Sequence, residues 1–230
     1  MKREDLHLFN QEKDYNLPKL DSKHMQYFVT GIGTEIGKTI VSAIVTEYLQ
    51  ADYWKPVQSG DLDWTDTMKV QALISNDRSV FHPERHRLQA PLSPHASAAL
   101  DGVEIKLSDF TLPQTSNHLI VEGAGGLLVP LNEQDVMLDL IQQLQIPVIL
   151  VSRNYLGSIN HTLLSIEALK HRQIPIAGIV FNGEPNPASE SFIEKNSQLP
   201  ILFRLGNLDQ ITPEIIRNVV EQLQIDFPKS

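Results

Sequence analysis

Ten residues near the start of the chain, Thr30 to Thr39, combine three glycines with a lysine and a threonine and end in Gly37-Lys38-Thr39. Glycines allow successive backbone N–H groups to turn toward phosphate oxygens, and the N-terminus of a following helix adds partial positive charge. In this pattern Lys38 bridges the terminal phosphates, and Thr39 offers its hydroxyl to Mg²⁺. The segment therefore predicts a loop that binds a nucleoside triphosphate together with Mg²⁺.

The loop is a variant of the common form. In the usual G-x-x-x-x-G-K-T spacing a glycine would stand at Ile32, whereas here Gly31 and Gly33 flank that position. Glu35 lies inside the loop, and two interpretations of it stay open. It contacts the ligand, or it is a solvated carboxylate that caps the following helix.

A carboxylate follows an apolar run farther along the chain. Glu122 comes directly after Leu119-Ile120-Val121 and before the glycine-rich stretch 123–126. Mg²⁺ prefers oxygen ligands, so the hydroxyl of a phosphate loop is normally joined by carboxylates from other strand ends. Glycines beside such a carboxylate let the backbone approach phosphate closely. We therefore expect Glu122 to bind the cation; the alternative is a charged cap at the end of the strand, before a flexible loop.

A second acid is expected between Ser59 and Thr67. Asp66 lies at the predicted start of a helix, where an aspartate is either a metal ligand or a plain N-cap. Asp61 and Asp63 lie in the same segment and could replace it. We predict Asp66 as the ligand and keep the other two as alternatives.

Lys55 follows the aromatic pair Tyr53-Trp54 and precedes Ser59 by four residues. A cation at the end of such a strand faces the rim of the sheet, where ligands bind in α/β folds. There it could stabilise charge on a transferred phosphoryl group and on a carboxylated substrate, while the Ser59 hydroxyl donates to the same oxyanion. The alternative is a surface lysine on an edge strand.

The composition is that of a folded globular chain. Its 230 residues are 41% hydrophobic and 20% charged, close to globular averages. The lack of cysteine excludes disulfides, thiolate metal sites and cysteine nucleophiles. A formal charge of −9 argues against nucleic acid as a partner, because phosphate backbones require surplus lysine and arginine. No apolar run approaches the about 20 residues of a membrane span, so we expect no membrane partner and a cytoplasmic location.

The pattern along the chain predicts one domain after a leading segment. Residues 1–24 are polar and without periodicity, so we expect a disordered or appended segment there, and a single domain over residues 25–230. Continuously apolar strands between helical stretches predict an α/β fold of the P-loop NTPase type, with a mostly parallel sheet and helices on both faces. Strands are predicted over residues 27–30, 53–56, 118–122, 147–152, 177–182 and 200–205. Helices are predicted over residues 38–50, 67–75, 96–100, 138–144, 160–171 and 213–223.

Six short motifs in this order resemble the dethiobiotin synthetase family. They are spread over about two thirds of the chain, from Tyr27 to Asn182. The motifs are YFVTG (27–31), TEIGKT (34–39), KPVQSG (55–60), SPH (93–95), VEGAGG (121–126) and LGSINH (156–161). Each alone is weak, but their combination and order are specific.

The resemblance implies a cytoplasmic homodimer, an ATP-dependent ligase of biotin synthesis. Such an enzyme converts 7,8-diaminopelargonic acid, carbon dioxide and ATP into dethiobiotin, ADP and phosphate. One amine becomes a carbamate, ATP phosphorylates the carbamate to a carbamic-phosphoric anhydride, and the neighbouring amine displaces phosphate to close the ureido ring. Residues 25–230 would then be a single P-loop ligase domain.

The resemblance also implies a role for each matching residue. The phosphates would be held by Glu35, Ile36, Gly37, Lys38, Thr39 and Ile40, and Mg²⁺ by Thr39, Asp66 and Glu122. Lys38 and Lys55 would stabilise phosphoryl transfer, and Ser59 would bind the carbamate. Nucleotide would also be approached by Gly123, Ala124, Gly125, Asn182 and Gly183, with Asn182 at the adenine. The substrate's carboxylate would be received by Leu156, Gly157 and Asn160, at a helix N-terminus.

The chain departs from the family pattern at three places. Gly33 stands where the family usually has an aspartate, the segment from Ser59 to Asp66 is short, and the segment after the last strand reads Leu205-Gly206-Asn207-Leu208. The last departure concerns base contacts and hence the strictness of ATP preference.

Two other families share the phosphate loop. Synthetases of the cobyric-acid type would share Glu122 as well, but they normally carry a further glutaminase domain. Partition-type ATPases, which are nucleotide switches, usually have an additional lysine early in the loop, where this chain has Gly31-Ile32-Gly33. Dependence of ATP turnover on a diamine, or on a protein or DNA partner, separates these readings.

Overall fold

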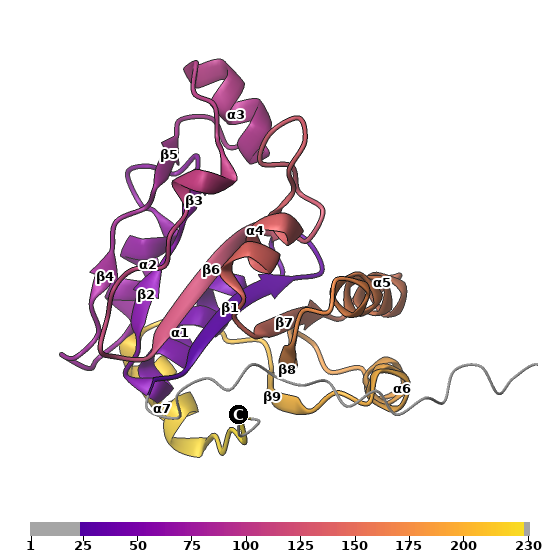
Figure 1. The fold of residues 1–230 in the computed structure, drawn as a ribbon. Coiled ribbons are helices and arrows are strands. Elements are labelled where there is room, and N and C mark those ends of the chain that lie inside the picture. Colours follow the sequence, from indigo (N-terminus) through magenta and orange to yellow (C-terminus); the bar gives the residue numbers. More distant parts are fainter. Residues whose placement is uncertain (1–23, 228–230) are drawn as a thin grey trace, which may run out of the picture.

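The computed structural model describes residues 24–227. The predicted leading segment, residues 1–24, lies outside the described residues except for His24, as do residues 228–230 of the predicted domain. Within the described range the main sheet has seven strands in the order β4-β2-β6-β1-β7-β8-β9, and all neighbours are parallel (Figure 1). Its strands are β1 (Gln26–Gly31), β2 (Asp52–Trp54), β4 (Phe81–His82), β6 (Leu119–Gly126), β7 (Val148–Arg153), β8 (Ile176–Asn182) and β9 (Ile201–Leu205).

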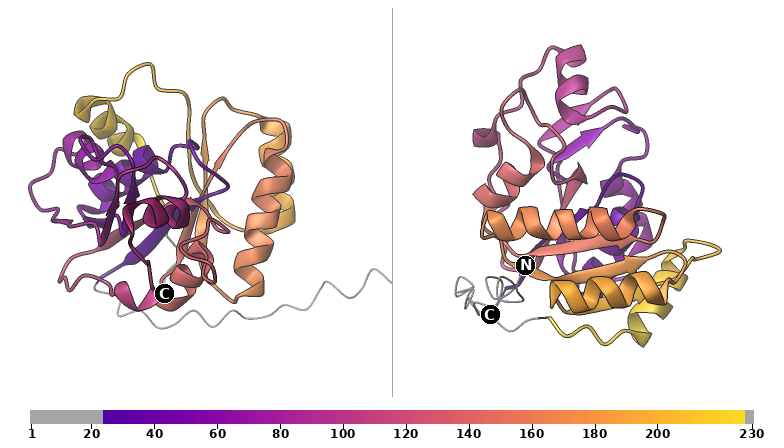
Figure 2. Two further views of the ribbon diagram at one scale, coloured as in Figure 1. Left: turned by 90° about the horizontal axis from the view of Figure 1, so that it is seen from above. Right: turned by 90° about the vertical axis from the view of Figure 1, so that its right-hand side faces the viewer.

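Helices cover both faces of this sheet, as predicted. One face is covered by α1 (Lys38–Leu49), α2 (Asp66–Leu73) and α7 (Pro213–Gln222). The other face is covered by α4 (Met137–Leu144), α5 (Ser158–His171) and α6 (Pro187–Ser197). Figure 2 shows α5 and α6 running side by side along the sheet.

A small second sheet lies above the main one in Figure 1. It pairs β3 (Val57–Ser59) with β5 (His86–Leu88) in parallel and contacts α3 (Pro94–Asp101). A short 3-10 helix, η2 (Leu107–Asp109), follows α3 in the chain. Because β3 continues the chain almost directly from β2, this sheet brings Ser59 close to the carboxyl ends of the central strands.

Alternate residues of the same strands fill the two faces of the core. In β1, Phe28 belongs to the core under α4, α5 and α6, whereas Tyr27 and Val29 belong to the core under α1 and α7. All three are buried. Successive side chains of a strand point to opposite faces, so a sheet covered on both sides needs continuous apolar runs. The polar loops are left at the carboxyl ends of the strands.

The six predicted strands and six predicted helices are confirmed, with shifts at their ends. The largest shift is in β6, which continues through the glycines to Gly126 instead of ending at Glu122. β3, β4 and β5 were not predicted, because strands of two or three residues are too short to show a period. α6 was not predicted because its sequence, PASESFIEKNS, is mostly polar. In the described part of the chain, no helix has the length and apolar character needed to cross a membrane.

Candidate functional site

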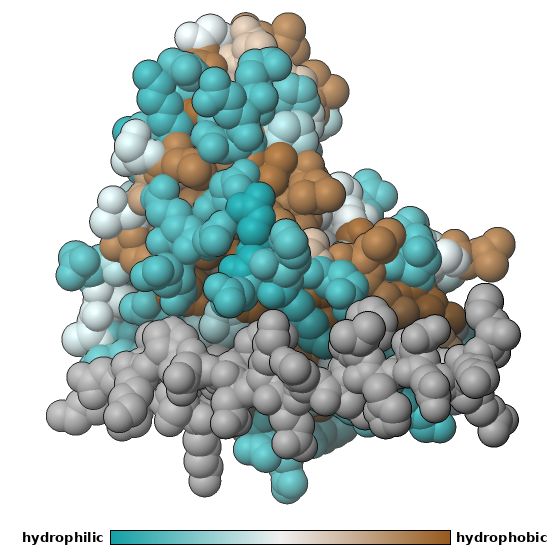
Figure 3. All heavy atoms as spheres, turned by 45° about the vertical axis from the view of Figure 1, so that its right-hand side comes forward, coloured by the Kyte–Doolittle hydropathy of each residue, from teal (hydrophilic) through white to brown (hydrophobic). Residues whose placement is uncertain are grey.

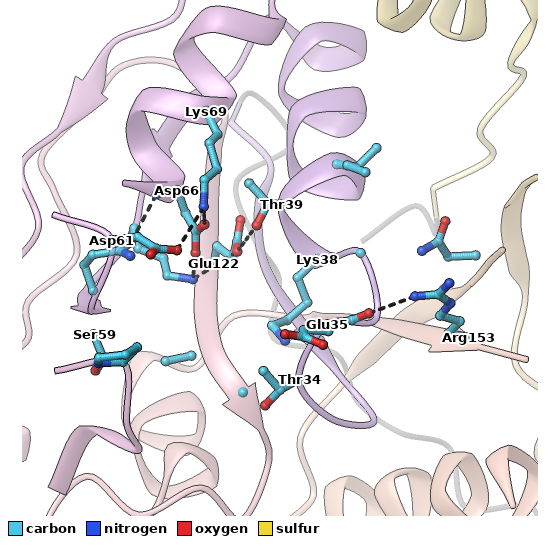
Figure 4. Close-up of a pocket in the computed structure, with 18 of the residues that line it drawn as sticks. Thr34, Glu35, Lys38, Thr39, Ser59, Asp61, Asp66, Lys69, Glu122 and Arg153 are labelled. Carbon is cyan, nitrogen blue, oxygen red and sulfur yellow. Dashed lines mark hydrogen bonds and ion pairs between the residues drawn. The ribbon is translucent and has the colours of Figure 1, made fainter. Parts of the chain in front are cut away.

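A cavity of about 980 Å³ lies at the carboxyl ends of the central strands (Figure 4). That volume is in the range of known small-molecule sites. Its wall combines the phosphate loop with Lys55, which follows β2, Glu122, which lies within β6, and Asn182, which ends β8. The connection from β3 to α2, residues 91–94 before α3 and residues 205–208 after β9 complete the lining.

The phosphate loop joins β1 to α1 through two residues in the left-handed region. Gly37, the N-cap of α1, has φ of 92°, and Glu35 has φ of 58°. A side chain at Gly37 would also overlap the amide of Asn182. Glycine is therefore required at Gly37 by both its conformation and its neighbour, whereas a Cβ at Gly33 would meet nothing within 4 Å.

Two side chains from other strands hold the backbone of this loop. Asn182 Nδ2, at the end of β8, donates to Ile36 O at 2.7 Å. Arg153 Nη1, at the end of β7, donates to Glu35 O at 3.1 Å (Figure 4). These bonds hold the loop backbone at Glu35 and Ile36 against the ends of β7 and β8.

The side chain of Lys38 folds back onto the phosphate loop. Its Nζ donates to Gly33 O at 2.8 Å, and the residue is 7% exposed. Burial, reinforced by the nearby Lys55 ammonium, lowers the pKa of Lys38 from 10.5 to about 8, although Glu122 and Asp66 act in the opposite direction. The proton on this amine is thus sensitive to whether negative charge occupies the cavity.

A buried cluster of one lysine and two carboxylates forms the cavity wall beside the loop. Lys55 Nζ lies 2.7 Å from Asp66 Oδ2 and 3.0 Å from Glu122 Oε1. It also donates to Gly123 O at 3.3 Å, so all three of its N–H bonds have partners. Burial alone would lower the pKa of Lys55, but the two carboxylates outweigh burial and raise it above its ordinary value. Burial would likewise raise the pKa of Asp66, but Lys55 holds it below the usual range. Lys55 and Asp66 are therefore both ionised at neutral pH.

Lys55 is thus not a surface lysine. β2 lies between β4 and β6, so it is not an edge strand, and Lys55 is only 4% exposed. Glu122 is fully buried in β6, which excludes a solvated cap at the end of a strand.

Glu122 is also tied to the phosphate loop. Thr39 Oγ1 donates to Glu122 Oε1 at 3.1 Å (Figure 4), and Tyr53 Oη donates to Glu122 Oε2 at 2.9 Å. The predicted metal ligands Thr39, Asp66 and Glu122 are therefore close together around Lys55. Their donors are all oxygens, one hydroxyl and two carboxylates, which is the set that Mg²⁺ prefers.

Of the three candidate aspartates, the structure favours Asp66. Asp61 lines the cavity, but its side chain is 70% exposed and, within residues 24–227, pairs with Lys69 alone. Asp63 is not among the described residues that line the cavity. Only Asp66 shares Lys55 with Glu122.

The short connection from Ser59 to Asp66 is closed by a side chain that sequence reasoning missed. Gln58 is 4% exposed, its Oε1 accepts from the Asp66 N–H at 3.1 Å, and its Nε2 donates to Gly60 O at 2.9 Å. Lys69 Nζ, one turn along α2, lies 3.2 Å from Asp66 Oδ1. The position of Gln58 directly before Ser59, the predicted substrate contact, was the sequence signal that could have identified it.

The Ser59 hydroxyl oxygen is buried in the cavity wall and has no hydrogen-bond partner among the described residues. A buried hydroxyl without a partner is unfavourable unless a ligand or water supplies one. The position therefore fits the predicted contact with a substrate oxyanion.

The structure divides the remaining predicted residues. Those that line the cavity are Glu35, Gly37, Ile40, Ala124, Gly125 and Gly183. Ile36 is buried beside it, with its side chain against Gly31. The exceptions are Gly123, whose carbonyl accepts from Lys55, and Leu156, Gly157 and Asn160 at the start of α5, none of which is among the described residues that line this cavity. Arg153 lines it but was not predicted, since nothing in its local sequence marks it.

Some known proteins resemble this chain in sequence, and others share only its fold. A family model described as an AAA domain matches residues 25–215. The ATP-dependent dethiobiotin synthetase of Christiangramia forsetii is 49% identical over 86% of this chain and 95% of its own, and that of Cytophaga hutchinsonii is 52% identical over 83% and 93%. A plasmid partition protein from Borrelia burgdorferi covers 86% of this chain and 97% of its own with a TM-score of 0.52, but at 14% identity it shares the fold alone.

Proposed function

The chain belongs to the ATP-dependent dethiobiotin synthetase family, and from this premise we propose how its residues divide the reaction. As a member of that family it is an ATP-dependent cyclo-ligase of biotin synthesis. Identities of 49% and 52% over more than four fifths of the chain carry the assignment. The observation that carries the mechanism is the buried Lys55–Asp66–Glu122 cluster beside the phosphate loop.

The proposed reaction has three steps. One amine of 7,8-diaminopelargonic acid adds to carbon dioxide and loses a proton, which forms a carbamate. A carbamate oxygen then attacks the γ-phosphorus of ATP, and the bond to ADP breaks. Finally the second amine attacks the carbamoyl carbon, the C–O bond to phosphate breaks, and a proton leaves the new ureido nitrogen.

The phosphate loop binds the nucleotide in this proposal. Backbone N–H groups of residues 35–40 surround the phosphates at the N-terminus of α1, and Lys38 leaves Gly33 O to pair with the terminal phosphates. At the adenine, Asn182 offers its amide oxygen and the second N–H of its amide nitrogen, since the first N–H donates to Ile36 O. Gly183 lies beside it along the wall.

Thr39, Asp66 and Glu122 hold Mg²⁺ in this proposal. The support is their donor chemistry and their proximity around Lys55. Bound there, Mg²⁺ would neutralise charge on the terminal phosphates. Gly123, Ala124 and Gly125 follow Glu122 without bulky side chains, so nucleotide and substrate can lie against their backbone.

Lys55 and Ser59 act on the carbamate. Because all three N–H bonds of Lys55 have partners, carbamate binding requires the ammonium to exchange one of them, and the longest is the 3.3 Å bond to Gly123 O. The Ser59 hydroxyl needs no exchange, since it has no partner among the described residues. Charge on the oxyanion is then stabilised in a buried setting, where such contacts are strongest.

We also propose a homodimer in which α5 of one copy completes the cavity of the other. The support is that Leu156, Gly157 and Asn160 do not line the cavity of their own chain, and that Leu156 is fully exposed and Leu164 is 58% exposed. Figure 3 shows apolar surface exposed on the side of the molecule that carries α5. There the helix N-terminus would receive the substrate's carboxylate.

Mixing two inactive variants tests this arrangement. Lys38→Ala and Asn160→Ala should each be inactive, whereas an equimolar mixture should recover about a quarter of wild-type activity, because half of the randomly formed dimers carry one intact site. No recovery, together with a monomeric mass in sedimentation, would contradict the shared site. The proposal also treats residues 25–230 as a single ligase domain in the cytoplasm, where ATP is supplied.

The reaction itself is tested by phosphate release with ATP, Mg²⁺ and bicarbonate, with and without the diamine. The expected result is release that depends on the diamine and on Mg²⁺, and that is lost in Lys38→Ala. Release that ignores the diamine but responds to DNA or a protein partner would favour a partition-type ATPase instead.

A further inference from the structure

A buried tyrosine reaches the proposed metal site from the strand next to Glu122. Tyr53 is the middle residue of β2, fully buried, and pairs in register with Ile120 of β6. Its phenol donates to Glu122 Oε2 at 2.9 Å, across 69 residues of sequence. Its ring lies 6.0 Å from that of Phe81, so the aromatic body is packed in the core while the hydroxyl alone meets the site.

The two oxygens of Glu122 have separate partners. Oε2 accepts from Tyr53, and Oε1 accepts from Thr39 at 3.1 Å and Lys55 at 3.0 Å. Rotation of the carboxylate would break both sets of bonds at once. The phenol therefore fixes the plane of the carboxylate, with one oxygen on Tyr53 and the other turned toward the cavity-lining residues Thr39 and Lys55.

A buried phenol normally finds some partner, so the bond by itself could be only structural. The identity of the acceptor favours a functional role as well, because the phenol bonds the fully buried carboxylate that Thr39 of the phosphate loop also contacts. Groups that hydrogen-bond a metal-binding carboxylate orient it and tune its affinity for the cation.

We propose that Tyr53 is a positioning residue, which holds Glu122 with Oε1 directed to the nucleotide-bound cation. The inference rests on the proposed role of Glu122 as a ligand of Mg²⁺. It adds to the site a side chain that touches neither substrate nor nucleotide.

The test removes one hydroxyl from each of two tyrosines. Tyr53→Phe deletes the bond to Glu122, and the matched control Tyr48→Phe deletes a phenol that bonds to the backbone of Ile225, at 3.2 and 3.4 Å. Mn²⁺ binding in the presence of a non-hydrolysable ATP analogue is measured by electron paramagnetic resonance. Nucleotide affinity without metal and thermal unfolding are measured beside it.

Tyr53→Phe should weaken Mn²⁺ binding about 10- to 100-fold with little change in metal-free nucleotide affinity. Tyr48→Phe should lower the unfolding temperature but leave Mn²⁺ binding at the wild-type value. In a Glu122→Gln background, Tyr53→Phe should change Mn²⁺ affinity no further, because the group that it orients is already altered.

Two results would count against the inference and are distinguishable. In the first, wild type and Tyr53→Phe bind Mn²⁺ with the same affinity, but the variant has a lower unfolding temperature. The phenol would then be merely structural. Wild-type protein that binds no Mn²⁺ with the nucleotide would overturn the proposed metal site, and the inference with it.

Discussion

Lys55 Nζ lies 2.7 Å from Asp66 Oδ2, so the cation expected to serve the substrate is already paired with an acid expected to serve the metal. The pair is buried, and Glu122 shares the same ammonium at 3.0 Å. Lys55 is therefore the counter-ion of both carboxylates of the proposed metal site. Substrate and cation binding must redistribute these three charges.

Lys55→Gln should uncouple binding from catalysis. Two buried carboxylates would lose their counter-ion, a change that costs about 3–5 kcal/mol of stability when one partner of a buried pair is removed. ATP should still bind through Lys38 and the loop backbone, but diamine-dependent turnover should be lost. Mg²⁺ without nucleotide should raise the unfolding temperature more than in wild type, since it can replace the missing charge.

The measurements are calorimetric ATP binding, phosphate release and thermal unfolding with and without Mg²⁺. Lys69→Gln is the matched control, because Lys69 contacts the other oxygen of Asp66, at 3.2 Å, and the exposed Asp61, and its side chain is 31% exposed. Its loss of activity should be smaller. Full diamine-dependent activity in Lys55→Gln would remove Lys55 from the mechanism.

The lowered pKa of Lys38, about 8 instead of 10.5, predicts proton uptake on nucleotide binding. Below pH 8 the Lys38 side chain is already charged before ATP binds, so binding should take up no proton at this group. Above pH 8 it is increasingly neutral, so affinity should fall as pH rises and uptake should approach one proton per ATP. Between pH 8 and 10.5 the unfolded chain binds more protons at this group than the folded chain, so its contribution to stability rises with pH.

Calorimetry in buffers of different ionisation enthalpy, at pH 7 and pH 9, measures this uptake. Lys38→Ala should abolish it and lower turnover by at least about 100-fold, as expected for one lost electrostatic contact to a developing charge. The variant should remain folded. Uptake that is the same at both pH values would contradict the assignment.

Glu122→Gln should weaken the Mg²⁺ dependence more than Asp66→Asn. Glu122 contacts Thr39 of the phosphate loop directly, at 3.1 Å, whereas the Asp66 carboxylate is shared between Lys55 and Lys69. Phosphate release titrated with Mg²⁺ compares the two midpoints. If Asp66→Asn has the larger effect, Asp66 is the principal ligand.

Ser59→Ala should separate activity from stability. Its hydroxyl oxygen has no partner among the described residues, so its removal relieves a buried unsatisfied group and the free energy of unfolding should stay the same or rise. Catalytic efficiency should fall by about 1–3 kcal/mol, the value of one oxyanion hydrogen bond. Ser97→Ala, which loses a bond to the Ala90 N–H at 3.1 Å, should do the reverse.

Much of the fold could be predicted because its signals are local. The strand, the glycine loop and the lysine lie within residues 27–39. The residues that set the backbone conformation are therefore neighbours in sequence of those that bind phosphate. α6 shows the limit, since its polar sequence hid the one side that packs on the sheet at Ile193. Asn186 and Pro187, an N-cap and a first-turn proline, were the signal that could have located it.

The sequence by itself determined the phosphate loop, the parallel α/β fold and which acids and cations were available for chemistry. Only the tertiary structure decided their pairing: Lys55 with Glu122, 67 residues away, Asn182 with Ile36, 146 residues away, and Asp66 in preference to Asp61 and Asp63. It also separated Leu156 from the cavity of its own chain. The reason is that spacing along the chain predicts which face or end of an element a residue occupies, whereas ion pairs depend on distances between elements, which strand order and packing alone set.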